Sequence, residues 1–387
     1  MTDWPRIAVI VHRLGPYHVA RLNALAWPSD LCCVETVAMD RTYGWGRVDE
    51  AGLKFRRFTL FDDEDRARDA DRLRSAVRDA LHAFGPNTVA VPGWGDAAGL
   101  FALEWATTRP DRTRRRILMS DSQAHDAPRR PHAEWIKRRV VAFADAGLVA
   151  GRTHADYLAA LGMPRDRIAT GYDVVDNAHF AGPSGGARDK TFLVVARFVP
   201  KKNLLALVRA HGRYADARRG AGGSPWRLIL VGEGPERAAL DEAAAASSGE
   251  VEIRPFAAYT DLPALYARAG ALVLPSTVEQ WGLVVNEAMA AGCPVVVTER
   301  AGVAAELVED GVTGHLTAPD EASLAAALAR MQDADRAALS RAAAVRIADW
   351  GPERFAHGML AARTAARPGR RTVWPVRMLG LLARRVI

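Results

Sequence analysis

The sequence has few cysteines and lacks both a long apolar run and a signal-like start. Its three cysteines, Cys32, Cys33 and Cys293, lie among apolar residues in strand-like segments. We interpret them as buried thiols rather than as a disulfide or a metal set. No apolar stretch is long enough to span a bilayer. An acid stands near the start and a strand follows at once, so we expect no secretory signal peptide. These absences favour the reducing cytoplasm.

The charge is basic, and motifs typical of nucleic-acid binding are missing. The sequence carries 52 lysines and arginines against 45 acids, a net charge of +7. Such a balance suits nucleic acid, an anionic membrane surface or a phosphate-bearing ligand. Because no zinc finger, RNA-recognition signature or Walker A loop is found, we do not expect a nucleic-acid partner. With 387 residues and 49% apolar content, the chain is large enough for two domains.

Residues 271–306 predict a strand, a loop, a helix and a second strand. The apolar run Ala271–Leu274 ends at a proline and is typical of a buried strand. Apolar residues recur at helical spacing over Leu283–Ala291, and Pro294–Thr298 is rich in β-branched residues. The loop therefore leaves the carboxyl end of a parallel strand and enters a helix N-terminus. Open α/β sheets bind ligands at this place, and the exposed N–H groups favour an anion.

Two carboxylates lie on either side of this turn. Glu279 lies in the loop and Glu287 lies in the helix, a spacing that cannot place both on one straight helical face. A tight turn at Gly282 lets both point toward one ligand and accept hydrogen bonds from its hydroxyls. The alternative, in which Glu279 is solvated and Glu287 stabilises the helix dipole, stays open from this pair alone.

Residues 279–296, EQWGLVVNEAMAAGCPVV, resemble the E-x7-E signature of retaining glycosyltransferases of family 4. The resemblance extends over nearly the whole chain. It implies an α/β GT-B fold, in which two Rossmann-like parallel-sheet domains enclose an interdomain cleft for the donor. We expect an N-terminal acceptor-side domain and a C-terminal nucleotide-sugar-binding domain, then a terminal helix that crosses back to the first domain, and a basic tail. Their expected ranges are 1–182, 190–348, 349–366 and 367–387.

Three further segments have two interpretations each. Asp62–Asp65 resembles an acidic metal cluster, but it precedes the charged helical segment Arg66–His82, and we interpret it as a solvated helix start. Trp135–Ala144 is a basic amphipathic helix, either on the surface with one buried stripe or in contact with a membrane. The tail 367–387 is interpreted as disordered, with a weak membrane anchor as the alternative. The segment 40–57 is turn-rich, and 181–190 is expected to be a linker.

Arg197 and Lys202 are the expected diphosphate ligands. Both lie on a predicted turn between the strand Thr191–Ala196 and a helix that begins at Leu204. Two cations beside a helix N-terminus would bind a diphosphate and stabilise it as a leaving group. The resemblance assigns the same role to this pair, and plain surface charge is the alternative.

The resemblance also implies the remaining donor contacts. It places Glu287 at the ribose hydroxyls, and Glu279 with the turn amides near Gly282 at the sugar. His125 is the nearest match to a histidine that contacts the donor sugar, and Asp121 and Ser122 compete for this role. The residues expected to take part in catalysis are Glu279, His125, Arg197 and Lys202. The expected donor-binding residues are Gly15, Arg197, Lys202, Gly232, Phe256, Glu279, Gly282, Leu283, Val284 and Glu287.

The expected function is transfer of a sugar from a nucleotide-diphosphate donor to an acceptor hydroxyl with retention of configuration. We expect a UDP-sugar first and a GDP-sugar second, with no cofactor and no metal. The acceptor would be a glycan or glycolipid of the cell envelope, with a small natural product as the alternative. The enzyme would be cytoplasmic and could contact the inner face of the membrane. A non-catalytic nucleotide-sugar binding protein and a non-hydrolysing sugar-nucleotide epimerase remain as other classes.

Overall fold

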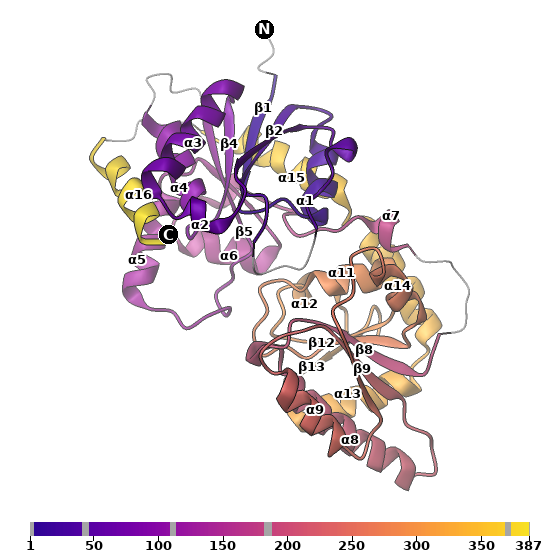
Figure 1. The fold of residues 1–387 in the computed structure, drawn as a ribbon. Coiled ribbons are helices and arrows are strands. Elements are labelled where there is room, and N and C mark those ends of the chain that lie inside the picture. The colour runs from indigo at the N-terminus through magenta and orange to yellow at the C-terminus, as the bar shows by residue number, and fades with distance from the viewer. Residues whose placement is uncertain (1–3, 41–45, 109–113, 182–187, 368–372, 387) are drawn as a thin grey trace. The chain divides into compact units, whose positions relative to one another are not determined.

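The computed structural model describes residues 4–40, 46–108, 114–181, 188–367 and 373–386, which form two compact α/β units (Figure 1). The first unit contains residues 1–124, 128–174 and 352–387, and the second contains residues 125–127 and 175–351. In Figure 1 the yellow C-terminal helices belong to the same unit as the indigo and magenta elements. The expected linker falls mostly on residues 182–187, which lie outside the described residues.

The first unit is built on a seven-stranded parallel sheet with the strand order β3-β2-β1-β4-β5-β6-β7. The order reverses between β1 and β4, which makes this point the topological switch of the sheet. The strands are β1 (Arg6–Val11), β2 (Asp30–Val37), β3 (Arg56–Phe61), β4 (Thr88–Pro92), β5 (Arg115–Ser120), β6 (Ala146–Val149) and β7 (Ile168–Thr170).

Helices cover both faces of this sheet. The helix α4 is buried from Ala98 to Ala106, because it packs against the sheet, α3 and α16. The helix α15 packs on α1, β6 and β7. The helices are α1 (Pro16–Leu25), α2 (Glu64–Ala67), α3 (Ala70–Phe84), α4 (Ala97–Thr108), α5 (Pro131–Val141), α6 (Arg152–Ala160), α15 (Pro352–Ala365) and α16 (Val373–Val386), with short 3-10 turns at Glu50–Gly52 and Arg165–Arg167.

The second unit is built on a six-stranded parallel sheet with the order β10-β9-β8-β11-β12-β13. Its switch point lies between β8 and β11. The strands are β8 (Thr191–Val195), β9 (Arg227–Val231), β10 (Val251–Arg254), β11 (Ala271–Leu274), β12 (Val295–Thr298) and β13 (His315–Thr317). The helices are α7 (Asn177–Phe180), α8 (Leu204–Gly220), α9 (Arg237–Ala245), α10 (Leu262–Arg268), α11 (Leu283–Ala290), α12 (Ala304–Leu307), α13 (Glu321–Asp333) and α14 (Arg336–Ala348), and a 3-10 turn covers Pro200–Lys202.

The expected fold class is confirmed, since both sheets are parallel and both strand orders are Rossmann-like. The cysteines are buried free thiols as expected, and burial raises the pKa of Cys293 to about 11. The acidic segment is a helix start: the Asp63 side chain accepts a hydrogen bond from the backbone N–H of Arg66 at 3.0 Å. Within the described ranges, no helix is long and apolar enough to cross a membrane.

Three local predictions are wrong. The segment 40–57 was expected to be turn-rich throughout, but its last two residues, Arg56 and Arg57, begin the strand β3, and its residues 41–45 lie outside the described residues. The single helix expected from Arg66 is two helices, because the Asp69 side chain accepts from the N–H groups of Asp71 and Arg72 and starts a new one. The tail is not disordered over residues 373–386, which form α16 with Leu379 fully buried against the core. Residues 368–372 of the tail lie outside the described residues.

Candidate functional site

Lys202 and Glu279 meet across the switch point of the second sheet. Lys202 follows β8 and Glu279 follows β11, and these strands are neighbours in the sheet. The Lys202 ammonium forms a hydrogen-bonded ion pair with Oε2 of Glu279, and Ser276 Oγ donates to the same oxygen at 3.1 Å. The two side chains are only 17% and 10% exposed. A buried carboxylate and a cation therefore lie where open α/β sheets bind their ligands.

The turn after Glu279 depends on a glycine. Gly282 has φ 110° and forms the N-cap of α11. A Cβ added there would lie 2.8 Å from Cδ2 of Leu274. The N–H groups of Leu283 and Val284 lie in the first turn of the helix and have no intrahelical acceptor. The turn thus presents a buried carboxylate and a helix N-terminus side by side, as the sequence pattern indicates.

Arg197 is an exposed cation at the carboxyl end of β8. Within the part of the chain that the structure describes, its guanidinium forms no hydrogen bond or ion pair. The loop after β9 packs against the backbone on either side of it. A Cβ on Gly232 would lie 1.9 Å from the carbonyl oxygen of Ala196, and one on Gly234 would lie 2.4 Å from that of Phe198. Only glycine allows this approach, which holds Arg197 beside the switch point.

Glu287 has a different environment from Glu279. It is 1% exposed, and its Oε2 accepts a hydrogen bond from the hydroxyl of Tyr266 on α10 at 2.6 Å. Burial raises the pKa of the nearby Tyr259, and the charges of Asp176 and Glu287 raise it further. The hydrogen bond from Tyr266 to Glu287 was not predicted, because Tyr266 lies on a short helix where an aromatic residue is typical of core packing. The only sequence signal for this hydrogen bond is the second carboxylate itself, Glu287, eight residues after Glu279.

Phe256 lies just after β10 and is 49% exposed. Its strand is separated from β8 by β9 in the sheet. The structure therefore places Phe256 on the same sheet edge as Arg197, with its ring accessible for stacking.

Gly15 and His125 belong to other parts of the chain. Gly15 is the N-cap of α1 with an extended backbone, and its N–H donates to Nδ1 of His18 at 3.2 Å. His125 is exposed in the loop between β5 and α5, where Asp121 and Ser122 are partly buried. Gly15 belongs to the first unit, whereas Lys202 and Glu279 belong to the second.

A pocket of about 330 Å³ opens at the switch point of the first sheet. Its lining includes residues that follow β1 and β4, such as His12 and Asp96, and residues of α2. Burial raises the pKa of the Asp96 carboxyl, although the Gly99 N–H donates to it at 2.6 Å. Among the described residues, no group of three or more metal-ligating side chains is found.

The fold of the chain is the GT-B fold of known glycosyltransferases. The solved lipopolysaccharide outer core galactosyltransferase WaaB aligns with a TM-score of 0.67 and 16% identity, covering 92% of this chain and 99% of WaaB. Anabaena HepE, solved in complex with UDP, aligns with a TM-score of 0.67 and 18% identity over 93% and 99% of the two chains.

The sequence of the second unit matches a family model. Residues 189–333 match the model of the glycosyl transferases group 1. Glycogen synthase of Mycobacterium tuberculosis is 49% identical over 89 residues, or 23% of this chain and 21% of that protein. D-inositol 3-phosphate glycosyltransferase of Acidothermus cellulolyticus is 32% identical over 261 residues, or 61% of this chain and 58% of that protein. The chain thus spans between a fifth and three-fifths of the length of these relatives.

Proposed function

We propose that the protein is a family 4 retaining glycosyltransferase that moves a sugar from a nucleotide-diphosphate donor to an acceptor hydroxyl. The observation that carries this proposal is the pair formed by Lys202 and Glu279 at the switch point of the second sheet. The exposed Arg197 beside it adds a second cation. The match of residues 189–333 to the glycosyl transferases group 1 supports the same assignment.

The chemistry requires that a diphosphate leave with new negative charge. Arg197 and Lys202, with the N-terminus of α11, supply positive charge at this point of the sheet, so the step needs no metal from the protein. Glu279 lies beside these cations, and its carboxylate would accept hydrogen bonds from sugar hydroxyls. The acceptor oxygen forms its bond to the anomeric carbon on the face from which the diphosphate leaves, and the departing phosphate oxygen takes the hydroxyl proton.

The donor is a UDP-sugar in this proposal, with a GDP-sugar second. Glu287, fixed by Tyr266, would accept from the ribose hydroxyls, and Phe256 would border the base. The HepE structures with UDP and with UDP-glucose show what that protein binds and support the choice. Residues 190–348 would hold most of the donor, and residues 1–182 would provide the acceptor side. Gly15 and His125 would be the donor contacts from residues 1–182.

The acceptor is a glycan or glycolipid, in the setting of the cytoplasmic side of cell-envelope assembly. A peripheral membrane contact is supported by two exposed apolar side chains on basic helices. Trp135 on α5 is 52% exposed and stacks under Arg139, and Leu381 on α16 is 63% exposed close to Arg384. Basic helices with exposed apolar residues are typical of interfacial binding. A small natural product is the alternative acceptor.

A thermal-shift titration tests the donor site. UDP, GDP and ADP are added to the wild type and to Arg197→Ala, Glu287→Ala and the control Lys201→Ala, whose side chain is exposed next to Lys202. A ligand that binds only the folded state raises Tm with its occupancy. We expect a shift with UDP that is lost in the first two variants and kept in the control. No shift with any nucleotide at millimolar concentration would refute the assignment.

Two assays separate the other classes. A binding protein without activity would show the nucleotide shift and release no UDP from UDP-sugars with any acceptor. An epimerase would change the configuration at C2 of free UDP-GlcNAc. Sugar transfer to an acceptor, with no change at C2 of free UDP-GlcNAc, supports the proposal.

A further inference from the structure

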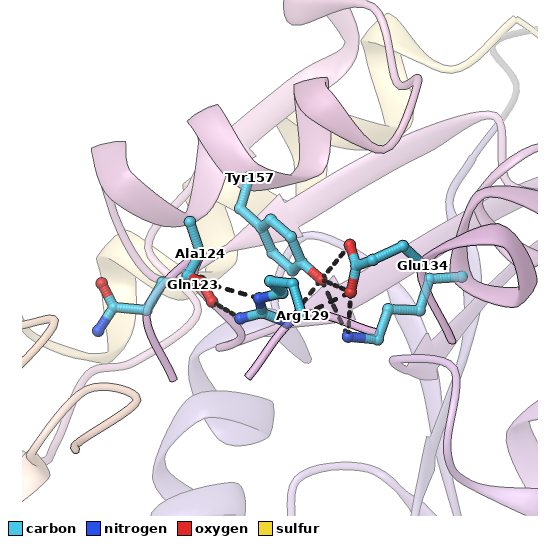
Figure 2. A network of polar contacts seen from close by, with 6 residues as sticks. Gln123, Ala124, Arg129, Glu134 and Tyr157 are labelled. Atoms are coloured by element: carbon cyan, nitrogen blue, oxygen red, sulfur yellow. Dashed lines mark hydrogen bonds and ion pairs between the residues drawn. The ribbon is translucent and has the colours of Figure 1, made fainter. Parts of the chain in front are cut away.

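One arginine holds the loop between β5 and α5 (Figure 2). Nε of Arg129 donates to the carbonyl oxygen of Ala124 at 2.8 Å, and its NH2 group donates to the carbonyl oxygen of Gln123. These carbonyls belong to the two residues that directly precede His125. A planar guanidinium has several N–H donors at fixed angles, so it can hold two adjacent carbonyls where a lysine would hold one.

The same guanidinium is fixed on its other side by Tyr157 of α6. Its NH1 group donates to the Tyr157 hydroxyl at 2.7 Å, and its carbon atom lies 4.3 Å from the centre of the tyrosine ring. The hydroxyl in turn donates to the carboxylate of Glu134 on α5 at 2.9 Å. Glu134 also lies 3.5 Å from Arg129. Figure 2 shows the Tyr157 and Glu134 side chains pointing toward Arg129 from two helices.

Lys137 completes the network and extends it to a second loop. Its ammonium lies 2.9 Å from Glu134 and 2.9 Å from the Tyr157 hydroxyl. It also lies 5.3 Å from the ring centre of Trp94, which follows β4 and packs edge-on against Tyr157. The network therefore joins the loops after two neighbouring strands of the first sheet.

The charges in this network are sheltered from solvent. Arg129, Glu134 and Lys137 are 24%, 20% and 18% exposed, and two cations share one carboxylate. Sheltered ion pairs are screened less than surface pairs, and the loss of one partner leaves the others without compensation. A sheltered hydrogen-bond network of this kind fixes one loop conformation rather than several.

We propose that Arg129 is a positioning residue that fixes the loop 121–128 for the sugar-transfer step. This inference rests on the proposed function, because the resemblance assigns a donor-sugar contact to His125 in this loop, with Asp121 and Ser122 as competitors. Arg129 acts through the backbone of Gln123 and Ala124 and not on the sugar itself. It therefore affects the rate of transfer and leaves nucleotide binding, which the proposed function assigns to residues 190–348, unchanged.

The test compares Arg129→Met, Arg129→Lys and the control Arg130→Met, whose side chain is exposed. UDP release from UDP-glucose gives kcat, and a thermal shift with UDP reports binding. We expect kcat of Arg129→Met to fall by about 10- to 100-fold, since small misplacements of reacting groups have effects of this size. Arg129→Lys should be intermediate, and the UDP shift should stay at the wild-type value in all three. In a fourth variant, Arg129→Ala, millimolar guanidinium ion should restore part of the activity.

Hydrogen exchange of the loop amides supplies a readout that does not depend on activity. Exchange at residues 121–127 should be faster in Arg129→Met than in the wild type and in Arg130→Met. Wild-type exchange and wild-type kcat in Arg129→Met would overturn the inference. So would loss of the UDP shift in that variant, because the effect would then be on the whole fold. If the wild type releases no UDP, the proposed function fails. Unchanged exchange in Arg129→Met would separately refute the role of Arg129 in fixing the loop.

Discussion

The Tyr266 hydroxyl donates to the Glu287 carboxylate at 2.6 Å inside the second unit, where both side chains are almost fully buried. Glu287 is therefore a fixed acceptor rather than a solvated helix residue. A buried carboxylate needs hydrogen-bond partners, because an unpaired buried charge is strongly destabilising. This pair links the packing of α10 on α11 to the proposed ribose contact.

Tyr266→Phe should weaken UDP binding by about tenfold or more, because a hydrogen bond to a charged group contributes about 1.5–3 kcal/mol. The measurement is the Kd of UDP by calorimetry. Tyr214→Phe is the matched control, since its hydroxyl accepts from the Trp226 N–H at 2.8 Å at a place unrelated to Glu287. Equal UDP affinity in Tyr266→Phe and the wild type would show that Tyr266 does not position Glu287.

Lys202→Met should lower kcat by about 10²–10³-fold, a size typical of losing one charge-stabilising donor. It also leaves Glu279 without its cation. The loss of kcat in the double variant Lys202→Met/Glu279→Gln should therefore be smaller than the two single losses combined. The measurement is steady-state UDP release for the single and double variants. Lys201→Met, one residue away and exposed, should match the wild type. Strict additivity would contradict a functional pair.

Gly232→Ala should destabilise the fold by more than about 2 kcal/mol, because the added Cβ meets a backbone carbonyl and must displace it. Gly311→Ala is the matched control. It also has positive φ, 77°, but its Cβ meets nothing within 4 Å, so it should lose only about 1 kcal/mol from backbone strain. Urea unfolding of the three proteins gives the comparison. Similar losses would show that the loop after β9 moves freely away from Ala196.

Glu134 should make the first unit sensitive to acid. Burial raises the pKa of its carboxyl, but hydrogen bonds from Lys137 and Tyr157 outweigh burial and leave the pKa below its ordinary value of 4.5. A lowered acid pKa adds stability that is present above the ordinary value and is lost as pH falls through the folded value. Glu134→Gln should therefore be less stable than the wild type at neutral pH, and the difference should shrink at low pH. A constant Tm difference from neutral pH to pH 3 would contradict this.

Much of the fold could be predicted because strands and turns have local signals. The apolar run Ala271–Leu274 and the β-branched run before Thr298 are strands with nearly the expected bounds. The helix α4 gave no amphipathic signal, since it is buried on every side. The strand Arg56–Phe61 was missed because it begins with two arginines, one of which pairs with buried Glu35.

The candidate site was predictable only where its residues are close in sequence. Glu279, Gly282 and the first turn of α11 follow from one motif and lie as expected. Partners brought in by tertiary packing left no local signal. Tyr266 is 21 residues from Glu287, and Tyr157 is 28 residues from Arg129. Such pairs form only when the chain folds, because Tyr266 and Tyr157 are brought to their partners by the packing of α10 and α6.

Transfer with retention is best tested by the anomeric configuration of the sugar first released or transferred from UDP-glucose. Proton NMR during the first turnovers distinguishes the α-anomer from the β-anomer before they interconvert. A retaining transferase gives the α-anomer, which we expect from the wild type, and we expect little product from Lys202→Met. The β-anomer as the first product would contradict a retaining transferase built on Lys202 and Glu279.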